Sequence, residues 1–134
     1  MGVALTKDSI DLGIVVSDAD RALGFYRDLL GLELVGETPM PGPARMYRLM
    51  CGTTMLKLWH YETPRTASAP PGGIPGATGY RYFTMSVSNL GEMAAACEAA
   101  GCTIAMPITE LRPGVTILIV EDPDGNWVEF LQAG

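Results

Sequence analysis

The chain has 134 residues, 48% of them hydrophobic, and a formal net charge of −6, which suits one globular domain able to bury roughly two-thirds of its unfolded surface. Its nine basic residues are scattered and form no stripe for phosphates, so nucleic acid and anionic membranes are poor partners. Because no apolar run reaches the roughly 20 residues of a membrane span and the start lacks the apolar segment of a signal peptide, a cytoplasmic protein is expected.

The first half of the chain predicts a strand, a capped helix and three further strands. The first strand covers Ile10 to Val16, and Ser17 or Asp18 caps a helix that continues to Gly31. Apolar residues at helical spacing mark its buried side, and alternating patterns between turn residues mark the strands. The later strands are expected near Leu32 to Gly36, Met46 to Cys51 and Thr54 to Tyr61, and the buried helix positions are Ala22, Leu23, Phe25, Tyr26, Leu29 and Leu30.

A segment rich in proline, glycine and small residues, TPRTASAPPGGIPGATG at 63–79, follows this first half and reads as a linker. The chain is therefore expected to be a single domain over residues 1–134. Its first module covers 8–62 and its second module covers 80–132.

The second half predicts the same succession of elements. Asn89 and Glu92 have the spacing of a capping box at the start of its helix. A turn at 122–125 (DPDG) joins its last two strands. The later strands are expected near Thr103 to Met106, Val115 to Glu121 and Asn126 to Gln132, and the buried helix stripe is Leu90, Met93, Ala94 and Cys97.

The two halves are related by an internal repeat. Residues 10–32 and 82–104 each run from a strand through a capped helix to a glycine. Val16 and Val87 are 71 residues apart, and the glycines Gly31 and Gly101 are 70 apart. Duplicated units of this size indicate a fold built from two copies of one motif, with a site that draws on both copies.

Side-chain alternation along the strands separates an apolar face, suited to a helix cover, from a face that carries polar groups. Four polar side chains occupy the second face, one on each of four strands, and the repeat relates them in pairs. Asp11 and Tyr82 are 71 residues apart, whereas Lys57 and Glu129 are 72 apart. The same parity brings Met55, Trp59, Tyr61 and Trp127 to this face as a ligand wall, with Arg48 and Arg81 as anchors for an anion.

Two segments, DLGIVVSDADRALGFYRDLLGLEL and EDPDGNWVEFLQ, resemble the diagnostic ends of the vicinal oxygen chelate (VOC) superfamily. That superfamily includes glyoxalase I, bleomycin and fosfomycin resistance proteins, methylmalonyl-CoA epimerase and extradiol dioxygenases. The resemblance covers nearly the whole chain and implies an α+β fold of two tandem βαβββ modules whose curled mixed sheets form a cup. A twofold partner commonly covers such a sheet, so a homodimer is expected.

Catalytic members of the superfamily hold a divalent metal with one ligand from each of four strands, usually histidines and carboxylates. Matched by position, the resemblance assigns these places to Asp11, Lys57, Tyr82 and Glu129. Only Glu129 keeps a usual ligand type, because a protonated lysine has no lone pair and a neutral tyrosine is a weak ligand. No cofactor is therefore expected; a divalent metal, which this set disfavours, would be held by Asp11 and Glu129.

An ammonium beside two carboxylates and a phenol can replace the charge of a metal ion, and carboxylates that share one ammonium should differ in acidity. The expected function is a glyoxalase-like isomerase, epimerase or lyase that binds a small organic ligand in its cup and moves a proton without metal. Two alternatives stay open: a bleomycin-resistance-like protein that sequesters its ligand, and a glyoxalase or dioxygenase with atypical metal ligands. The expected catalytic residues are Asp11, Lys57, Tyr82 and Glu129, and the expected ligand-binding residues are Met55, Trp59, Tyr61, Trp127 and Arg48.

Overall fold

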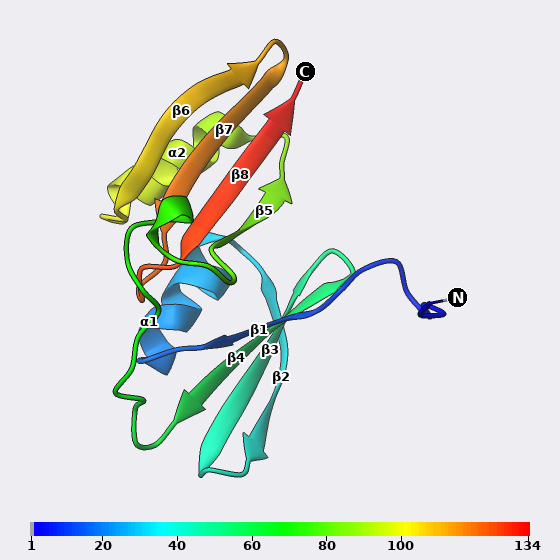
Figure 1. Ribbon diagram of the computed structural model, residues 1–134, viewed down its shortest axis with the longest axis vertical. Coiled ribbons are helices and arrows are strands. Elements are labelled where there is room, and N and C mark those ends of the chain that lie inside the picture. Colours follow the sequence, from blue (N-terminus) through cyan, green and yellow to red (C-terminus); the bar gives the residue numbers. More distant parts are fainter. Residues whose placement is uncertain (1) are drawn as a thin grey trace. The chain divides into compact units, whose positions relative to one another are not determined.

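The computed structural model describes residues 2–134, and these residues form two compact units (Figure 1). The first unit ends at Thr66, and the second runs from Ala67 to Gly134. None of the helices within residues 2–134 has the length and apolar character that a bilayer crossing requires.

Unit 1 is a four-stranded mixed sheet with one helical segment packed against it. The strand order is β1-β4-β3-β2, in which β1 runs parallel to β4 and the other neighbours are antiparallel. Its elements are β1 (Leu12–Val15), α1 (Ala19–Leu23), the π-helical segment η1 (Gly24–Leu29), β2 (Glu33–Met40), β3 (Ala44–Cys51) and β4 (Thr54–Tyr61).

Unit 2 repeats this plan with the order β5-β8-β7-β6, and α2 packs against β6, β7 and β8. The pair β5–β8 is parallel, and its other neighbours are antiparallel. The predicted α+β fold of two βαβββ modules is confirmed. The elements are the 3-10 turn η2 (Ile74–Gly76), β5 (Tyr82–Ser86), α2 (Leu90–Ala99), β6 (Ile104–Arg112), β7 (Val115–Glu121) and β8 (Trp127–Ala133).

The internal repeat predicted from the sequence extends to the strand register. Gly13 is opposite Lys57 in unit 1, and Thr84 is opposite Glu129 in unit 2. The bond that ends each parallel pair is also repeated: the Val16 amide donates to the Trp59 carbonyl at 2.8 Å, and the Val87 amide donates to the carbonyl of Leu131 at 2.9 Å. First strands therefore match at an offset of 71 residues and last strands at 72, as the sequence predicts.

Alternation along the strands produces the two predicted faces. The apolar positions of β4 and β8 form the core of each unit: Leu56 and Leu58 are buried in unit 1, as are Val128 and Phe130 in unit 2. Lys57 and Glu129, on the intervening positions, are half-buried. We call the face of each sheet that carries Lys57 or Glu129 its helix-free face.

The helix predicted to run to Gly31 begins at Asp18, whose Oδ1 accepts the Arg21 amide at 2.9 Å, but it changes type at Gly24. From there the turns are π-helical, and the Leu30 amide donates to the Phe25 carbonyl at 2.9 Å. The wider turn lets two consecutive aromatic residues, Phe25 and Tyr26, enter the core with their rings edge to face at 4.8 Å. The helical segment therefore has the predicted extent, and its second part is π-helical instead of α-helical.

Two predicted strands were too short because their ends were placed at glycine or proline. Strand β2 continues through Pro39 to Met40, and β6 continues through Pro107 to Arg112. Both are edge strands, in which a proline can leave its missing N–H on the unpaired side. Strand β1 is shorter than predicted and starts at Leu12, because the preceding residues are held by side-chain bonds instead.

The predicted capping box of the second helix is wrong. Asn89 is the N-cap residue of α2, but its side chain makes no cap hydrogen bond and instead lies 3.4 Å from the Glu92 carboxylate. The amide of Leu90 donates to Oε1 of Gln132 at 2.8 Å. A side chain from β8 thus satisfies one of the free amides at the start of this helix.

Candidate functional site

The helix-free face of unit 1 is arranged as rows of residues that lie opposite one another across the strands. One row contains Gly13, Lys57, Arg48 and Gly36, from β1, β4, β3 and β2 in turn. The predicted catalytic lysine is therefore the direct neighbour of the predicted anion anchor Arg48. Sequence reasoning missed this pairing, although the two-residue turn at Gly52 and Thr53 predicts it.

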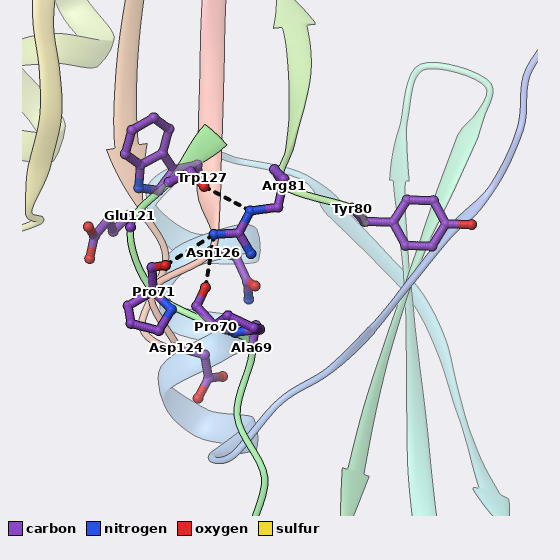
Figure 2. A pocket seen from close by; sticks show the side chains of 12 residues that line it. Ala69, Pro70, Pro71, Tyr80, Arg81, Glu121, Asp124, Asn126 and Trp127 are labelled. Carbon is purple, nitrogen blue, oxygen red and sulfur yellow. Dashed lines mark hydrogen bonds between the residues drawn. The ribbon is translucent and has the colours of Figure 1, made fainter. Parts of the chain in front are cut away.

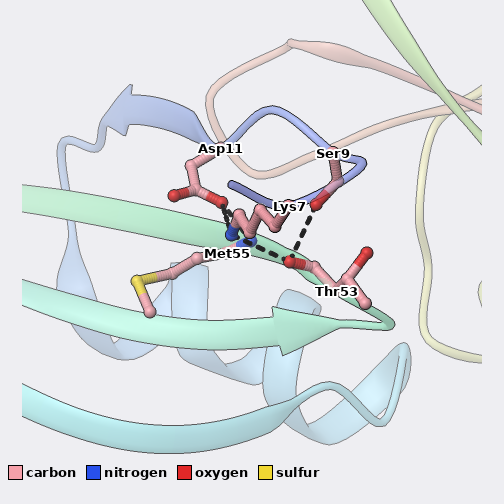
Figure 3. A network of polar contacts seen from close by, with 5 residues as sticks. All are labelled: Lys7, Ser9, Asp11, Thr53 and Met55. Carbon is pink, nitrogen blue, oxygen red and sulfur yellow. Dashed lines mark hydrogen bonds and ion pairs between the residues drawn. The ribbon is translucent and has the colours of Figure 1, made fainter. Parts of the chain in front are cut away.

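Asp11 lies just before β1 and fastens the N-terminal segment to the β3–β4 turn (Figure 3). Its Oδ1 accepts the Lys7 ammonium at 2.6 Å and the Met55 amide at 2.9 Å. Lys7 and Ser9 both donate to the Thr53 carbonyl at 3.0 Å. The hydrogen bond from Lys7 and that from Met55 hold the pKa of Asp11 below its usual value, and the charge of Lys57 contributes least. The ion-pair partner of Asp11 in unit 1 is thus Lys7, which the sequence analysis did not identify.

The Met55 amide donates a hydrogen bond to Asp11, so its protection from exchange with solvent depends on that carboxylate. We expect the Met55 amide to exchange with solvent faster in Asp11→Ala than in wild type, because its acceptor is removed. Asp11→Asn keeps an acceptor and should lie between the two. The pKa of Asp11 is lowered in the folded protein. The stabilisation that its carboxylate provides is therefore present above the usual pKa of 3.8 and is lost as pH falls through the folded pKa.

Hydrogen exchange followed by NMR on the Met55 amide measures this effect. Asp8→Ala is a matched control, because it removes an exposed carboxylate from the same segment. Equal exchange at Met55 in all three Asp11 forms would show that the bond does not persist in solution.

The rows on either side of Lys57 and Arg48 on the helix-free face of unit 1 are apolar and aromatic. Met46 is opposite Trp59 in the row next to Lys57, and Met50 is opposite Met55 on its other side. The rings of Trp59 and Tyr61 stack with centroids 6.5 Å apart, and the Arg65 guanidinium lies 4.3 Å above Tyr61. The half-buried methionines, Trp59 and Tyr61 give unit 1 a surface suited to an apolar or aromatic group.

In unit 2 the predicted carboxylate is held by a neighbouring hydroxyl. Thr84 is opposite Glu129, and its Oγ1 donates to Oε1 of Glu129 at 2.6 Å. Tyr82 lies opposite Trp127, one row away, and is 49% exposed. Within residues 67–134, no other hydrogen bond to the Glu129 carboxylate is found, so Oε2 is left as an acceptor.

A polar pocket of about 190 Å³ lies within unit 2, between residues 69–73 and the β7–β8 turn (Figure 2). Arg81 organises its wall: the guanidinium donates to the carbonyls of Gly73 at 2.8 Å, Pro70 at 2.9 Å and Pro71 at 3.4 Å. The guanidinium thus fixes the backbone of the predicted linker, and its part as an anchor for a ligand anion stays a prediction. Of the residues predicted for the site, Arg81 and Trp127 line this pocket; Glu121, Asp124 and Asn126 were missed.

The residues at the four family ligand positions do not fit a divalent metal. Asp11 already accepts two hydrogen bonds on one oxygen, an ammonium at Lys57 offers no lone pair, and the Tyr82 phenol is a weak ligand. Within residues 2–134, no group of three or more histidine, cysteine, aspartate and glutamate side chains is placed to hold a metal ion. Glu129 alone is a good ligand, and one carboxylate does not make a site.

Comparison with known proteins agrees with this fold. A lactoylglutathione lyase of Haemophilus influenzae is 26% identical over 125 residues, covering 87% of this chain and 86% of the relative. The structure of a lactoylglutathione lyase from Agrobacterium tumefaciens, 26% identical, superposes with a TM-score of 0.66 over 96% of each chain. The structure of a glyoxalase family protein from Bacillus cereus, 18% identical in sequence, superposes with a TM-score of 0.80 over 97% of this chain and 99% of the other.

A family model also matches residues 9–130, which include both βαβββ units and all four predicted catalytic positions. It describes the Glyoxalase/Bleomycin resistance protein/Dioxygenase superfamily. The match spans nearly the whole chain. The chain therefore belongs to the glyoxalase/bleomycin resistance protein/dioxygenase superfamily.

Proposed function

We propose that this chain is a metal-independent lyase or isomerase that moves a proton on a small carbonyl or hydroxy compound. The observation that carries the proposal is the Glu129 carboxylate, with one oxygen fixed by Thr84 at 2.6 Å and the other left to accept a proton. A positioned carboxylate of this kind is a general base. The relatives named lactoylglutathione lyase support chemistry on a lactoyl-type compound.

The other predicted catalytic residues take different parts in this proposal. Lys57 supplies a positive charge on the helix-free face of unit 1, of the kind that stabilises an oxyanion. Tyr82 supplies a phenol that can donate or accept a hydrogen bond. Asp11, with its lowered pKa, is a weaker base than an ordinary carboxylate, so its proposed role is to keep the region before β1 in place.

The two alternatives predict different behaviour. The stacked pair of Trp59 and Tyr61 would also suit a protein that binds an aromatic ligand without changing it. A metal enzyme with Asp11 and Glu129 as ligands is disfavoured by the chemistry of the other two positions. A homodimer and a cytoplasmic location stay predictions.

Proton transfer can be tested without knowing the natural substrate. Protein treated with a chelator and desalted is incubated in D2O with lactoylglutathione and with a set of 2-hydroxy acids and 2-oxo acids. We expect NMR to show deuterium entering the carbon next to the carbonyl of at least one compound, at a rate that chelation does not change.

Other results would favour the alternatives. Exchange that appears only after zinc, nickel or manganese is added would support a metal enzyme. Saturable binding of a compound without any exchange would support sequestration and contradict the proposed proton transfer.

A further inference from the structure

Two cations lie side by side on the helix-free face of unit 1, and no carboxylate of that unit's described residues forms an ion pair with either of them. Lys57 on β4 is directly opposite Arg48 on β3, and the outer positions of the row are glycines, Gly13 and Gly36. Like charges directly opposite one another destabilise a pair of strands. Within residues 2–66 the ion pairs join Lys7 to Asp11 and Arg27 to Asp28, so neither cation of this row has a carboxylate partner there.

The Arg48 side chain is held in place over one of these glycines. A Cβ atom at Gly36 would lie 2.3 Å from Nη2 of Arg48, so the guanidinium lies across the bare backbone of β2. Its Nε is buried and has no hydrogen-bond partner among the described residues. The guanidinium therefore lies against the sheet, and within residues 2–66 no carboxylate forms an ion pair with it.

Space is left at the other end of the row. A Cβ atom at Gly13 would meet nothing within 4 Å, so the surface beside Lys57 is open. Met46 and Trp59 form the neighbouring row. A ligand group that reached both cations would thus have an apolar surface beside it.

The equivalent row of unit 2 has no cation. It consists of Thr84, Glu129, Ile119 and Met106, in the same order across the strands. The repeated fold does not itself require positive charge at these positions, because unit 2 forms the same sheet without it. The two cations are a property of the first unit's surface.

We propose that Arg48 and Lys57 form an anion-binding site that takes the carboxylate of a small organic acid, whose apolar part lies against Met46 and Trp59. A planar guanidinium matches a carboxylate with two hydrogen bonds, and the ammonium adds a third donor. This site belongs to unit 1 alone. The proposed proton transfer does not require a ligand of this class.

The test is a titration of the full chain with phenylacetate and with its neutral amide, phenylacetamide, followed by calorimetry. We expect saturable binding of phenylacetate and binding of the amide that is about tenfold to a hundredfold weaker. Arg48→Met and Lys57→Met should each weaken phenylacetate binding by a similar factor and leave the amide little changed.

Two further variants distinguish direct contact between the ligand and Arg48 from a general effect of the protein's charge. Gly36→Ala leaves every charge in place but pushes the guanidinium from its position, so it should weaken phenylacetate binding as well. Arg45→Met removes the same charge from an exposed position on the opposite face of β3, and binding should not change. If Arg48→Met fails to fold, Arg48→Lys keeps the charge without the planar fork and should give partial binding.

Three results would overturn the site: no saturable binding of phenylacetate, equal affinity for acid and amide, or equal loss in Arg45→Met and Arg48→Met. Repeating the titration with Glu129→Gln keeps the two proposals apart. That variant should not lose affinity for phenylacetate even though its rate of proton transfer falls.

Discussion

Glu129→Gln is expected to lower the rate of proton exchange at the substrate carbon roughly a hundredfold to ten-thousandfold, the usual contribution of a general base. The substitution keeps the size of the side chain and an oxygen that can accept the Thr84 hydroxyl, now 2.6 Å from Oε1. The fold should therefore survive while the basic oxygen is lost. The rate of deuterium entry measured by NMR, together with thermal unfolding, separates these effects.

Thr84 provides a graded comparison for this variant. Thr84→Val removes the hydroxyl and keeps the side-chain shape, so it should lower kcat by less than Glu129→Gln does. Thr84→Ser should restore much of the loss, because a hydroxyl alone is needed to position the carboxylate. A Glu129→Gln protein that exchanges the substrate proton at the wild-type rate would exclude Glu129 as the base.

Asp122→Ala is expected to lower the free energy of unfolding by about 3 kcal/mol, because buried donors lose a charged acceptor. Asp122 is only 5% exposed, and its Oδ1 accepts the amides of Asp124 and Asn126, each at 2.9 Å. Its Oδ2 accepts Nδ2 of Asn126, also at 2.9 Å. The carboxylate thus shapes the turn between β7 and β8.

The matched variant Asp122→Asn separates the two oxygens. It can keep the amide bonds at one oxygen but places an NH2 group toward the Asn126 amide, so it should cost less than Asp122→Ala. Urea unfolding of both variants measures the difference. Equal stability of wild type and Asp122→Ala would mean that the turn does not depend on this side chain.

The fold was largely predictable because its main signals are local. Strands β4 (Thr54–Tyr61) and β7 (Val115–Glu121) have the predicted bounds, since each is a run of strand-forming residues that begins just after a glycine turn. The interaction that starts α2 was not predictable from its own sequence. Its acceptor is Gln132 on β8, and no local spacing signals a partner 42 residues away.

The candidate site was predictable in the parity of its residues but not in their partners. Alternation placed Lys57 and Glu129 on the helix-free faces, and the register confirms this. The partner of Asp11 proved to be Lys7, which precedes the first strand in an irregular segment without a periodic pattern. The neighbour of Lys57 is Arg48. It could have been predicted by pairing β3 with β4 across the turn at Gly52.

The position of the last strand in each sheet has a consequence for how the chain emerges from the ribosome. Strands β4 and β8 are the last of their units to be synthesised, yet each lies between the first strand and the third. Until β8 is available, β5 has no neighbour in its sheet, and its contact to Glu129 spans 45 residues. Strand β5 and the edge of β7 that later pairs with β8 are therefore unpaired during translation, a period in which such edges favour aggregation. Slow translation across residues 127–133 would lengthen this exposure, and rapid completion of β8 would shorten it.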